Sequence, residues 1–489
     1  MRYMSGSRTP CAARPSSRLL TIGLMVLAFV GFATPVVADQ QANDARIANE
    51  IDTILTERFS DSQPGAAAIV VKDGRAIYRK GHGLANLELR VPMRPEMVFQ
   101  VGSITKQFTS AAILMLVEQG KVNLDDDLRT YLPEYPDKGA RISIEHLLTH
   151  TSGIKSYTDD PKWFAMWRQD MTPAEIIAIT QDQPLDFPPG TKFLYNNTGY
   201  VILGAVIEKV TGQAYGEFIR NSIFEPLGMT STRYGTNFDL VLNRAYGYSK
   251  DGDKIVNAPF LSMTQPFAAG SIESTVDDLA TWEAAVSSRK LLTEASWDRI
   301  FTSYKLANGD DTGYGYGWKI GQFEGHRVIR HDGGIPGYLS EVLRMPDDRV
   351  YVALLTNSDA SGLATGFIAT RLASVAAGIP YREPTKVSLD SNVLDQYVGV
   401  YRIDETSERV VRRNGDHLTT QRTDGVPLAA YPSGNDDFFY KDSYTRLHFT
   451  RDARGKVTGV VMVQGGSSQV APRTDKPVPP ESDDRQSVP

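Results

Sequence analysis

Two residues that could cooperate in nucleophilic catalysis lie one helical turn apart in the segment VGSITKQFTS (101–110). They are Ser103 and, three residues later, Lys106. Residues three apart on a helix share a face, so both side chains are expected to point the same way. A serine hydroxyl is a weak nucleophile until a base removes its proton, and a desolvated lysine can be neutral enough to do so. The helix N-terminus also offers free backbone N–H groups for an oxyanion. The pair therefore indicates acyl transfer through a serine.

The Ser-x-x-Lys pattern also has ordinary explanations, because it occurs three times in the chain. Ser152-x-x-Lys155 includes a glycine directly after the serine, which is typical of a loop. Ser287-x-x-Lys290 lies near the end of an amphipathic helix, where the helix dipole favours a cation. Ser103 itself could be a helix cap. Other residues have to decide between a cap and a nucleophile.

Two further patterns each occur once. Tyr195-Asn196-Asn197 directly precedes an expected helix, and His331-Asp332-Gly333 lies on an expected strand that leads into the glycine-rich turn GGIPG. Either asparagine could cap the helix that follows. His331 could be an ordinary hydrogen-bonded histidine in a strand. The combination is more specific than any one of its parts.

The order and separation of the three patterns resemble those of the serine hydrolases of the class C β-lactamase and D-alanyl-D-alanine carboxypeptidase type. That penicillin-binding-protein-like family carries Ser-x-x-Lys, then Tyr-x-Asn, then Lys-Thr-Gly or His-x-Gly, and it includes D-aminopeptidases and esterases. The resemblance covers about residues 42–378. It includes the early hairpin GAAAIVVKDGRAIYRKGHG, the segment ISIEHLLTHTSGI, and YGYGW ahead of the third pattern.

The resemblance implies a role for each matching residue. Ser103 would be the acylated nucleophile, while Lys106 and Tyr195 would share the proton transfers, with a nearby ammonium favouring the phenolate form of the tyrosine. Asn197 would hydrogen-bond the acyl side of the substrate, and His331 would replace the usual lysine. The backbone N–H groups of Ser103 and Gly334 would form the oxyanion hole. The implied substrate-binding residues are Asn197, His331, Asp332, Gly333 and Gly334. No metal or cofactor is implied.

The third pattern departs from the family at Asp332, where a hydroxyl residue is frequent. If the Asp332 carboxylate faces the site, it would repel a substrate carboxylate. His331 is expected to be cationic only part of the time near neutral pH. Strong penicillin hydrolysis is then disfavoured, and neutral esters, amides or peptides with a free amine become better substrates. Alternatively, Asp332 lies on the other face of its strand and says nothing about the substrate.

The elements around these patterns predict an α+β fold. Strand patterns occur near residues 65–83 and again after Thr312, where YGYGWKIG, HRVIRHDGG, GYLSEVLRM and RVYVALLTNS look like consecutive antiparallel strands, with helices between the two groups. That order predicts an antiparallel sheet flanked by helices and assembled from both ends of the segment, plus an inserted helical lobe. A ligand site between sheet and lobe is expected.

The chain divides into five predicted regions. Arginines at 2, 8, 14 and 18 precede the apolar run LLTIGLMVLAFVGFATPVVA, so residues 1–38 read as an export signal cleaved after Ala38, with an uncleaved membrane anchor as the alternative. Residues 39–379 form the hydrolase domain and 380–389 a linker. Residues 390–470 carry short β patterns typical of a small barrel or sandwich. Residues 471–489 are too polar to fold and form a disordered tail.

Composition restricts the partners. The 489-residue chain has a formal net charge of −6 and no basic block in its mature part, so nothing favours nucleic acid. Its single cysteine, Cys11, falls in the export signal, which leaves the mature protein without a thiol for disulfides, catalysis or zinc. We expect no stable membrane insertion after signal cleavage. The oligomeric state stays open.

The sequence therefore predicts a periplasmic or secreted serine hydrolase that acts on amide or ester bonds of small or short-peptide substrates, such as D-amino-acid-containing peptides. A broad carboxylesterase or a weak β-lactamase is the alternative among enzymes. An alternative of another class is a sensor that binds β-lactams or muropeptides through a slowly hydrolysed acyl-enzyme.

Overall fold

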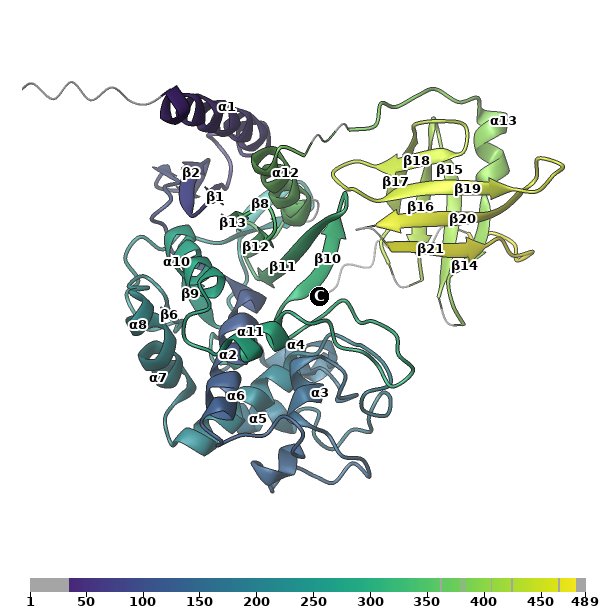
Figure 1. Ribbon diagram of the computed structural model, residues 1–489. Coiled ribbons are helices and arrows are strands. Elements are labelled where there is room, and N and C mark those ends of the chain that lie inside the picture. The colour runs from purple at the N-terminus through teal and green to yellow at the C-terminus, as the bar shows by residue number, and fades with distance from the viewer. Residues whose placement is uncertain are drawn as a thin grey trace, which may run out of the picture. The chain divides into compact units, whose positions relative to one another are not determined.

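A computed structural model describes residues 35–360, 363–379, 381, 383–405, 407–423, 425–464 and 467–480 of the chain. Its central feature is an antiparallel sheet of six strands within these residues, in the spatial order β10-β11-β12-β13-β1-β2 (Figure 1). The strands are β10 (Lys319–Phe323), β11 (His326–Ile335), β12 (Tyr338–Met345), β13 (Val350–Thr356), β1 (Ala66–Lys72) and β2 (Arg75–His82).

The sheet is assembled from both ends of the segment. Strand β1 pairs with β2 through the Asp73-Gly74 hairpin and, on its other side, with β13, so that Ala66 lies opposite Thr356. Asp73 and Gly74 both adopt positive φ, as this tight turn requires. The predicted α+β architecture is confirmed.

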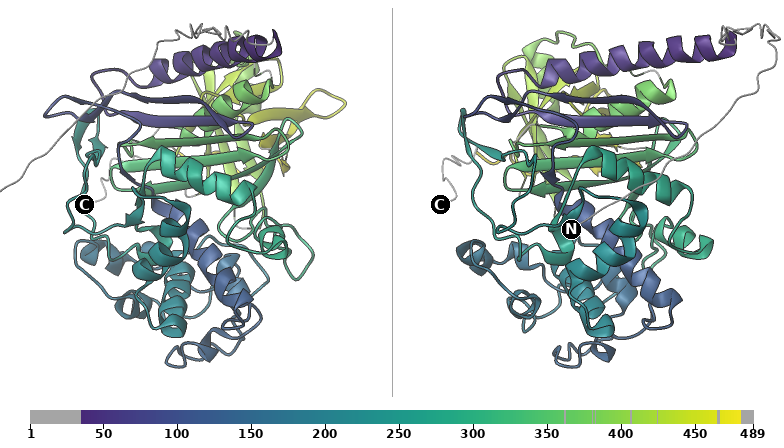
Figure 2. Two further views of the ribbon diagram at one scale, coloured as in Figure 1. Left: turned by 60° about the vertical axis from the view of Figure 1, so that its left-hand side comes forward. Right: turned by 90° about the vertical axis from the view of Figure 1, so that its left-hand side faces the viewer.

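Each face of the sheet packs against its own group of helices. Ala66, Ala68 and Val70 of β1 face a cluster with α1 (Pro35–Arg58) and α12 (Thr365–Ala377). Ala67 and Ile69 face the larger cluster formed by the helical lobe. This alternation follows from the two-residue period of a strand. Figure 2 shows α10 (Val276–Ser287) and the lobe on the side of the sheet opposite to α12.

The helical lobe lies between β2 and β10 in the chain. Its helices are α2 (Thr105–Glu118), α3 (Ile144–Leu148), α4 (Pro161–Met166), α5 (Pro173–Ala178), α6 (Asn197–Thr211), α7 (Tyr215–Ile219), α8 (Glu225–Leu227) and α9 (Phe267–Gly270), followed by α10 and α11 (Glu294–Ile300). Helix α5 begins with a capping box formed by Thr172 and Glu175. Helix α2 is buried on nearly all sides because almost every residue from Thr105 to Leu116 is enclosed.

Short strands form three small sheets among the described residues between β2 and β10. Strands β3 (Leu84–Asn86) and β4 (Val91–Pro92) form one pair, and β7 (Tyr248–Asp251) pairs with β8 (Lys254–Asn257). A third small sheet has the order β5-β9-β6, with β5 (Phe99–Gln100), β9 (Ile272–Ser274) and β6 (Arg233–Tyr234). Strand β5 directly precedes the Ser103 segment, so this sheet fixes where that segment enters the fold.

The segment YGYGW, which was expected to be part of a strand, is a loop in the structure. Only Tyr314 makes an isolated bridge, to Lys319, and β10 begins at that lysine. Gly313 and Gly317 have φ of +66° and +75°, which a regular strand cannot include. A side chain at Gly317 would lie 2.7 Å from the Lys106 carbonyl oxygen. The loop therefore packs directly against the backbone of α2.

The C-terminal region is an antiparallel meander of eight strands among the described residues. Each strand pairs with the next, and Tyr401 bridges to Arg473 so that the ends of the sheet nearly close. The predicted small all-β domain is confirmed in this form. It begins with α13 (Ser391–Leu394), followed by β14 (Gly399–Arg402), β15 (Glu408–Asn414), β16 (His417–Arg422), β17 (Leu428–Pro432), β18 (Asp437–Tyr440), β19 (Arg446–Arg451), β20 (Val457–Gln464) and β21 (Ser467–Pro472).

The C-terminal end of the chain differs from its prediction, and most of the predicted N-terminal signal is outside the described residues. Strand β21 continues to Pro472, two residues into the segment predicted as a tail, and the Thr474 backbone N–H donates to the Val400 carbonyl. Most of the predicted export signal lies outside the described residues, while α1 runs through the predicted cleavage position. Among the described helices, none is long and apolar enough to cross a bilayer.

Candidate active site

Ser103 lies in a 3-10 turn, η1 (Gly102–Ile104), that leads directly into α2. Neither η1 nor α2 has a side-chain cap at its start, so Ser103 is not a helix cap. Its side chain is partly exposed. The Ser103 Oγ atom lies 3.0 Å from the Nζ atom of Lys106, within hydrogen-bond distance. The expected shared face is therefore present.

Lys106 is completely buried, with 0% of its surface exposed. Its amine also donates to Asn197 Oδ1 at 2.9 Å and to the Ala269 carbonyl at 2.8 Å. Burial lowers the pKa of Lys106 well below its usual value, and the opposing effect of the Asp332 carboxylate is smaller. An amine with such a lowered pKa is suited to accept a proton from the Ser103 hydroxyl.

Tyr195 lies beside this amine, with its ring centroid 4.8 Å from Lys106 Nζ. Its hydroxyl is buried and has no hydrogen-bond partner of normal geometry among the described residues. Burial raises the pKa of Tyr195 well above its usual value, and the nearby Ser103 hydroxyl offsets only part of that shift. The phenol is therefore protonated at rest, which makes the expected phenolate form wrong for the unliganded site.

Replacing Tyr195 with phenylalanine will lower kcat by about 100-fold, the usual size of a lost proton donor or acceptor. The unfolding temperature should change little, because the hydroxyl has no partner to lose. Steady-state kinetics on an ester substrate and thermal unfolding test both points. Tyr135→Phe is the matched control, since it also removes a buried hydroxyl without a partner, on the turn before α3. Equal kinetics for the two variants would contradict this assignment.

The two asparagines after Tyr195 have different structural roles. Asn196 is the N-cap of α6, and its Oδ1 accepts the Gly199 backbone N–H at 2.7 Å. Asn197 is then free to face the site, where its Oδ1 accepts from Lys106 and its Nδ2 donates to Thr158 Oγ1 at 3.1 Å. The capping explanation therefore applies to Asn196 alone.

His331 is buried, with only 1% exposed, and its two ring nitrogens are both occupied. Nδ1 donates to the Asp332 carbonyl at 2.6 Å, so Nε2 accepts from the Tyr314 hydroxyl at 2.8 Å. Burial lowers the pKa of His331 to about 3, more than the Asp332 carboxylate raises it. The imidazole is neutral near pH 7, so the expected partial positive charge is absent.

Asp332 lies on the opposite face of β11 from His331, the second of the two placements that the sequence left open, so a substrate-binding role for its carboxylate is not supported. It forms an ion pair with Lys319 of β10 and lines a surface hollow together with Thr370 of α12. Burial raises the pKa of this carboxyl, but the nearby cationic groups, chiefly the Lys319 ammonium, together outweigh that effect and lower the pKa to about 2. The alternation of a strand explains this placement, because neighbouring residues point to opposite faces.

Asp332→Ser will therefore change kcat/KM for β-lactams and for esters by less than about threefold, as for a partly exposed ion pair without contact to the reacting atoms. The measurement is the ratio of the two kcat/KM values in the wild type and the variant. Lys319→Ser, which removes the other half of the same pair, is the matched control. A selective gain in β-lactam turnover for Asp332→Ser would show that the carboxylate acts on the substrate.

Glycines bring the start of α2 against β11. Gly102 has a φ of +52°, and a side chain there would lie 2.9 Å from the Gly334 nitrogen. A side chain at Gly333 would lie 2.1 Å from the Val101 carbonyl oxygen. Gly334 itself is exposed. The two backbone N–H groups expected to bind an oxyanion, those of Ser103 and Gly334, thus belong to two segments in direct contact.

Three contributors to the site were not among the predicted residues. Gly102 permits the close approach just described. Tyr314 holds the His331 ring, and His150 lies with its ring centroid 4.3 Å from that of Tyr195. His150 has a φ of +58° and accepts the Asn196 backbone N–H. Both aromatic residues lie in segments that carry the family resemblance, HLLTHTSG and YGYGW, which was the available signal.

The arrangement combines a partly exposed alcohol, an amine of lowered pKa, a protonated phenol and two nearby backbone N–H groups. These are the parts that acyl transfer through a covalent serine intermediate needs. In the described part of the chain, no group of three or more His, Cys, Asp or Glu side chains converges as a metal site.

Comparison with known proteins agrees with this geometry. The family model named Beta-lactamase matches residues 47–377, and a second model, a domain of unknown function (DUF3471), matches residues 383–476. The chain belongs to the beta-lactamase family. As a member of this family, it is a serine hydrolase of the penicillin-binding-protein or D-aminopeptidase type.

Relatives of this beta-lactamase family protein include penicillin-binding protein 4* of Bacillus subtilis, 27% identical over 87% of this chain and 98% of the relative. A D-aminopeptidase of Brucella anthropi is 28% identical over 67% of this chain and 62% of the relative. Among solved structures, the octameric penicillin-binding protein homologue from Pyrococcus abyssi has a TM-score of 0.63 at 28% identity, covering 87% of this chain and 97% of that one. A D-stereospecific amidohydrolase from Streptomyces has a TM-score of 0.54 at 28% identity over 65% of this chain and 94% of that one.

Proposed function

We propose that this protein hydrolyses amide or ester bonds of small D-amino-acid-containing substrates through an acyl-enzyme on Ser103, and that residues 1–38 direct its export. The observation that carries the proposal is the 3.0 Å contact between the Ser103 hydroxyl and the fully buried Lys106 amine. The names of two relatives, a D-aminopeptidase and a D-stereospecific amidohydrolase, support the substrate class.

In the proposed reaction, Ser103 Oγ attacks the substrate carbonyl while Lys106 Nζ accepts the hydroxyl proton. The Ser103 and Gly334 N–H groups bind the oxyanion. The protonated Tyr195 phenol donates to the leaving amine or alcohol, and the Lys106 ammonium returns a proton to Tyr195. Water then attacks the acyl carbon and loses a proton to Lys106 Nζ. The bond from the acyl carbon to Ser103 Oγ breaks, and the Lys106 ammonium returns that proton to Oγ, so that the acid leaves with Ser103 and the neutral amine restored.

The neutral His331 supports uncharged substrates over β-lactams. A neutral imidazole cannot form an ion pair with the carboxylate that penicillins carry, and both of its nitrogens are already hydrogen-bonded. Lys319 on the neighbouring strand β10 is paired with Asp332 on the other face. We therefore expect D-amino-acid amides and neutral esters to react faster than β-lactams.

Mass spectrometry of Ser103 acylation, together with turnover, tests the proposal across p-nitrophenyl esters, D- and L-amino-acid p-nitroanilides, penicillin and a chromogenic cephalosporin. We expect rapid turnover of the esters and D-anilides and slow deacylation of β-lactams. Efficient β-lactam hydrolysis without D-anilide turnover would make the protein a β-lactamase. An acyl-enzyme that persists with every substrate would make it a sensor. For export, the mature N-terminus should be Asp39 in protein recovered outside the cytoplasm.

A further inference from the structure

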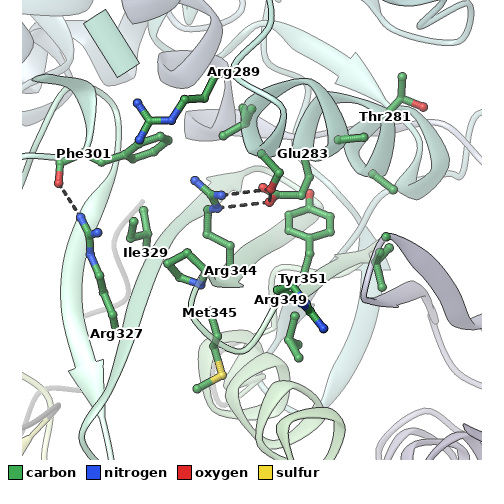
Figure 3. Close-up of a pocket in the computed structure, with 18 of the residues that line it drawn as sticks. Thr281, Glu283, Arg289, Phe301, Arg327, Ile329, Arg344, Met345, Arg349 and Tyr351 are labelled. Carbon is green, nitrogen blue, oxygen red and sulfur yellow. Dashed lines mark hydrogen bonds and ion pairs between the residues drawn. The ribbon is translucent and has the colours of Figure 1, made fainter. Parts of the chain in front are cut away.

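A second hollow, away from Ser103, lies between α10 and the sheet. Its volume is about 910 Å3, within the usual range for small-molecule sites. The floor is one row of paired residues across the sheet, in which Ile329, Arg344, Tyr351 and Val71 lie side by side on successive strands. Figure 3 shows Ile329, Arg344 and Tyr351 of this row, with Glu283 of α10 above them and Phe301 at one side.

Arg344 is the centre of the hollow and is only 7% exposed. Its Nε lies 3.2 Å from a carboxylate oxygen of Glu283, and its guanidinium lies 4.9 Å from the centroid of the Phe301 ring. Burial raises the pKa of Glu283, and Arg344 opposes that shift. A buried ion pair of this kind contributes little net stability. Its position beside an open hollow therefore suggests a role in binding.

The lining carries more positive than negative charge. Four arginines line it against two carboxylates, so its formal charge is +2. Arg289 pairs with Asp298, and Arg349 pairs with Asp73 outside the hollow. Arg327 donates to the Phe301 carbonyl at 2.9 Å and forms no ion pair among the described residues. The lining residues concerned are Arg289, Arg327, Arg344, Arg349, Glu283 and Asp298.

Most of the remaining lining is apolar, with the hydroxyl side chains of Thr281, Ser287 and Thr302 among it. Ile69, Val71, Ala280, Val286 and Ile329 face the same space as the arginines. A ligand that fits both parts has a negatively charged head and an uncharged body. Carboxylates form paired hydrogen bonds with guanidinium groups, and the Phe301 ring offers a surface for an apolar or aromatic body.

We propose that this hollow, here named the α10 site, binds a small apolar carboxylate, with the head at Arg344 and Arg327 and the body against Phe301 and α10. Two sources share this chemistry. A free apolar amino acid also carries an ammonium, which Glu283 can accept, whereas an N-acylated amino acid or a plain aromatic acid carries none.

The test uses the full-length Ser103→Ala variant, so that the result does not depend on the proposed hydrolase activity. Binding of N-acetyl-phenylalanine, phenylalanine and phenylpropionate, the amino-acid probes in both D and L forms, is measured by calorimetry and ligand-observed NMR. N-acetyl-phenylalanine amide, which has the same body without the charge, is the matched ligand control. We expect the amide to bind at least about 10-fold more weakly, as for loss of a hydrogen bond to a charged group. The free amino acid binding tighter than its N-acetyl form would identify the amino acid as the source, and the reverse order would identify an acylated or plain acid.

Three variants locate the ligand. Arg327→Gln should weaken binding by about 3- to 10-fold, while Arg454→Gln, on an exposed turn of the C-terminal region, should not. Ala284→Trp should fill the hollow from the exposed side of α10 and abolish binding without removing a charge. Arg344→Met combined with Glu283→Leu replaces the buried pair together, which avoids an unpaired buried charge. It should also abolish binding. Three results would each overturn the proposal. They are equal binding of the amide and the acids, unchanged binding in Ala284→Trp, and no binding of any carboxylate at about 10 mM.

Discussion

Ser103→Ala will lower kcat/KM by about 10⁵-fold or more, because removal of a covalent nucleophile leaves only binding and oxyanion stabilisation. The fold should be unaffected, since the Ser103 side chain is partly exposed and caps no helix. The measurement is ester hydrolysis, with the loss of the acyl adduct followed by mass spectrometry of the intact protein and of the peptide that contains residue 103.

Ser110→Ala is the matched control for this loss. Ser110 lies on α2, the helix that follows the Ser103 turn, and its hydroxyl is 3.2 Å from that of Tyr200, in the interior of the lobe. We expect its catalytic constants to stay within about twofold of the wild type, as for a residue without contact to the reacting atoms. An acyl adduct that survives in Ser103→Ala, on any other residue, would remove Ser103 from the mechanism.

Lys106→Arg will be as inactive as Lys106→Met, with kcat lower by about 10³- to 10⁴-fold in both. The arginine keeps the charge and much of the length of the lysine, but its guanidinium stays protonated at any ordinary pH and cannot accept a proton. Position 106 is also fully enclosed, so a larger planar group will crowd the Ala269 carbonyl and Asn197. Circular dichroism and thermal unfolding will show whether each variant is folded.

The pH dependence of the wild type gives an independent check on Lys106. Its pKa is lowered by burial, and only the neutral amine can accept the Ser103 proton. The logarithm of kcat/KM should therefore rise with pH up to the lowered pKa of Lys106 and then level off, below the usual lysine range. No inflection from His331 is expected between about pH 5 and pH 8, because its pKa is about 3. Activity retained by Lys106→Arg, or a rise that continues to the usual lysine pKa, would contradict a neutral base.

Much of the site could be predicted because its residues are defined by short spacings. Ser103 and Lys106 are one helical turn apart, and Asn197 follows Tyr195 by two residues at the start of a helix, so local geometry fixes their relative positions once the helices form. The strand containing His331 was also expected. For these residues the spacing in the sequence is enough to predict their relative positions in the structure.

Other features depend on contacts that no short pattern encodes. The face of β11 on which Asp332 lies is set by its register with Glu341 of β12 and by the Lys319 pair. Tyr314 is in a loop because Gly313 and Gly317 take positive φ, and Gly317 lies directly against the α2 backbone. The neutral states of Tyr195 and His331 result from burial, which is a property of the folded interior and not of the residue types.

The C-terminal region illustrates the same distinction on the scale of a fold. Its turn signals predicted many short antiparallel strands, and the meander confirms them because each strand pairs with its neighbour in the chain. The sequence did not decide between a barrel and a sandwich. That choice depends on the near closure through Tyr401 and Arg473, which joins residues more than seventy positions apart.

The pairing of β1 with β13 affects how the chain can reach its native state. Ala66 meets Thr356, so the central sheet cannot close until nearly three quarters of the polypeptide has been made, whereas the C-terminal meander needs only contacts between adjacent segments. Distant pairings slow folding because the entropy of a long loop is lost before the contact that offsets this loss has formed. The hydrolase region should thus be the slow-folding part of the molecule, and chains that end before residue 350 should remain unable to acquire a native core.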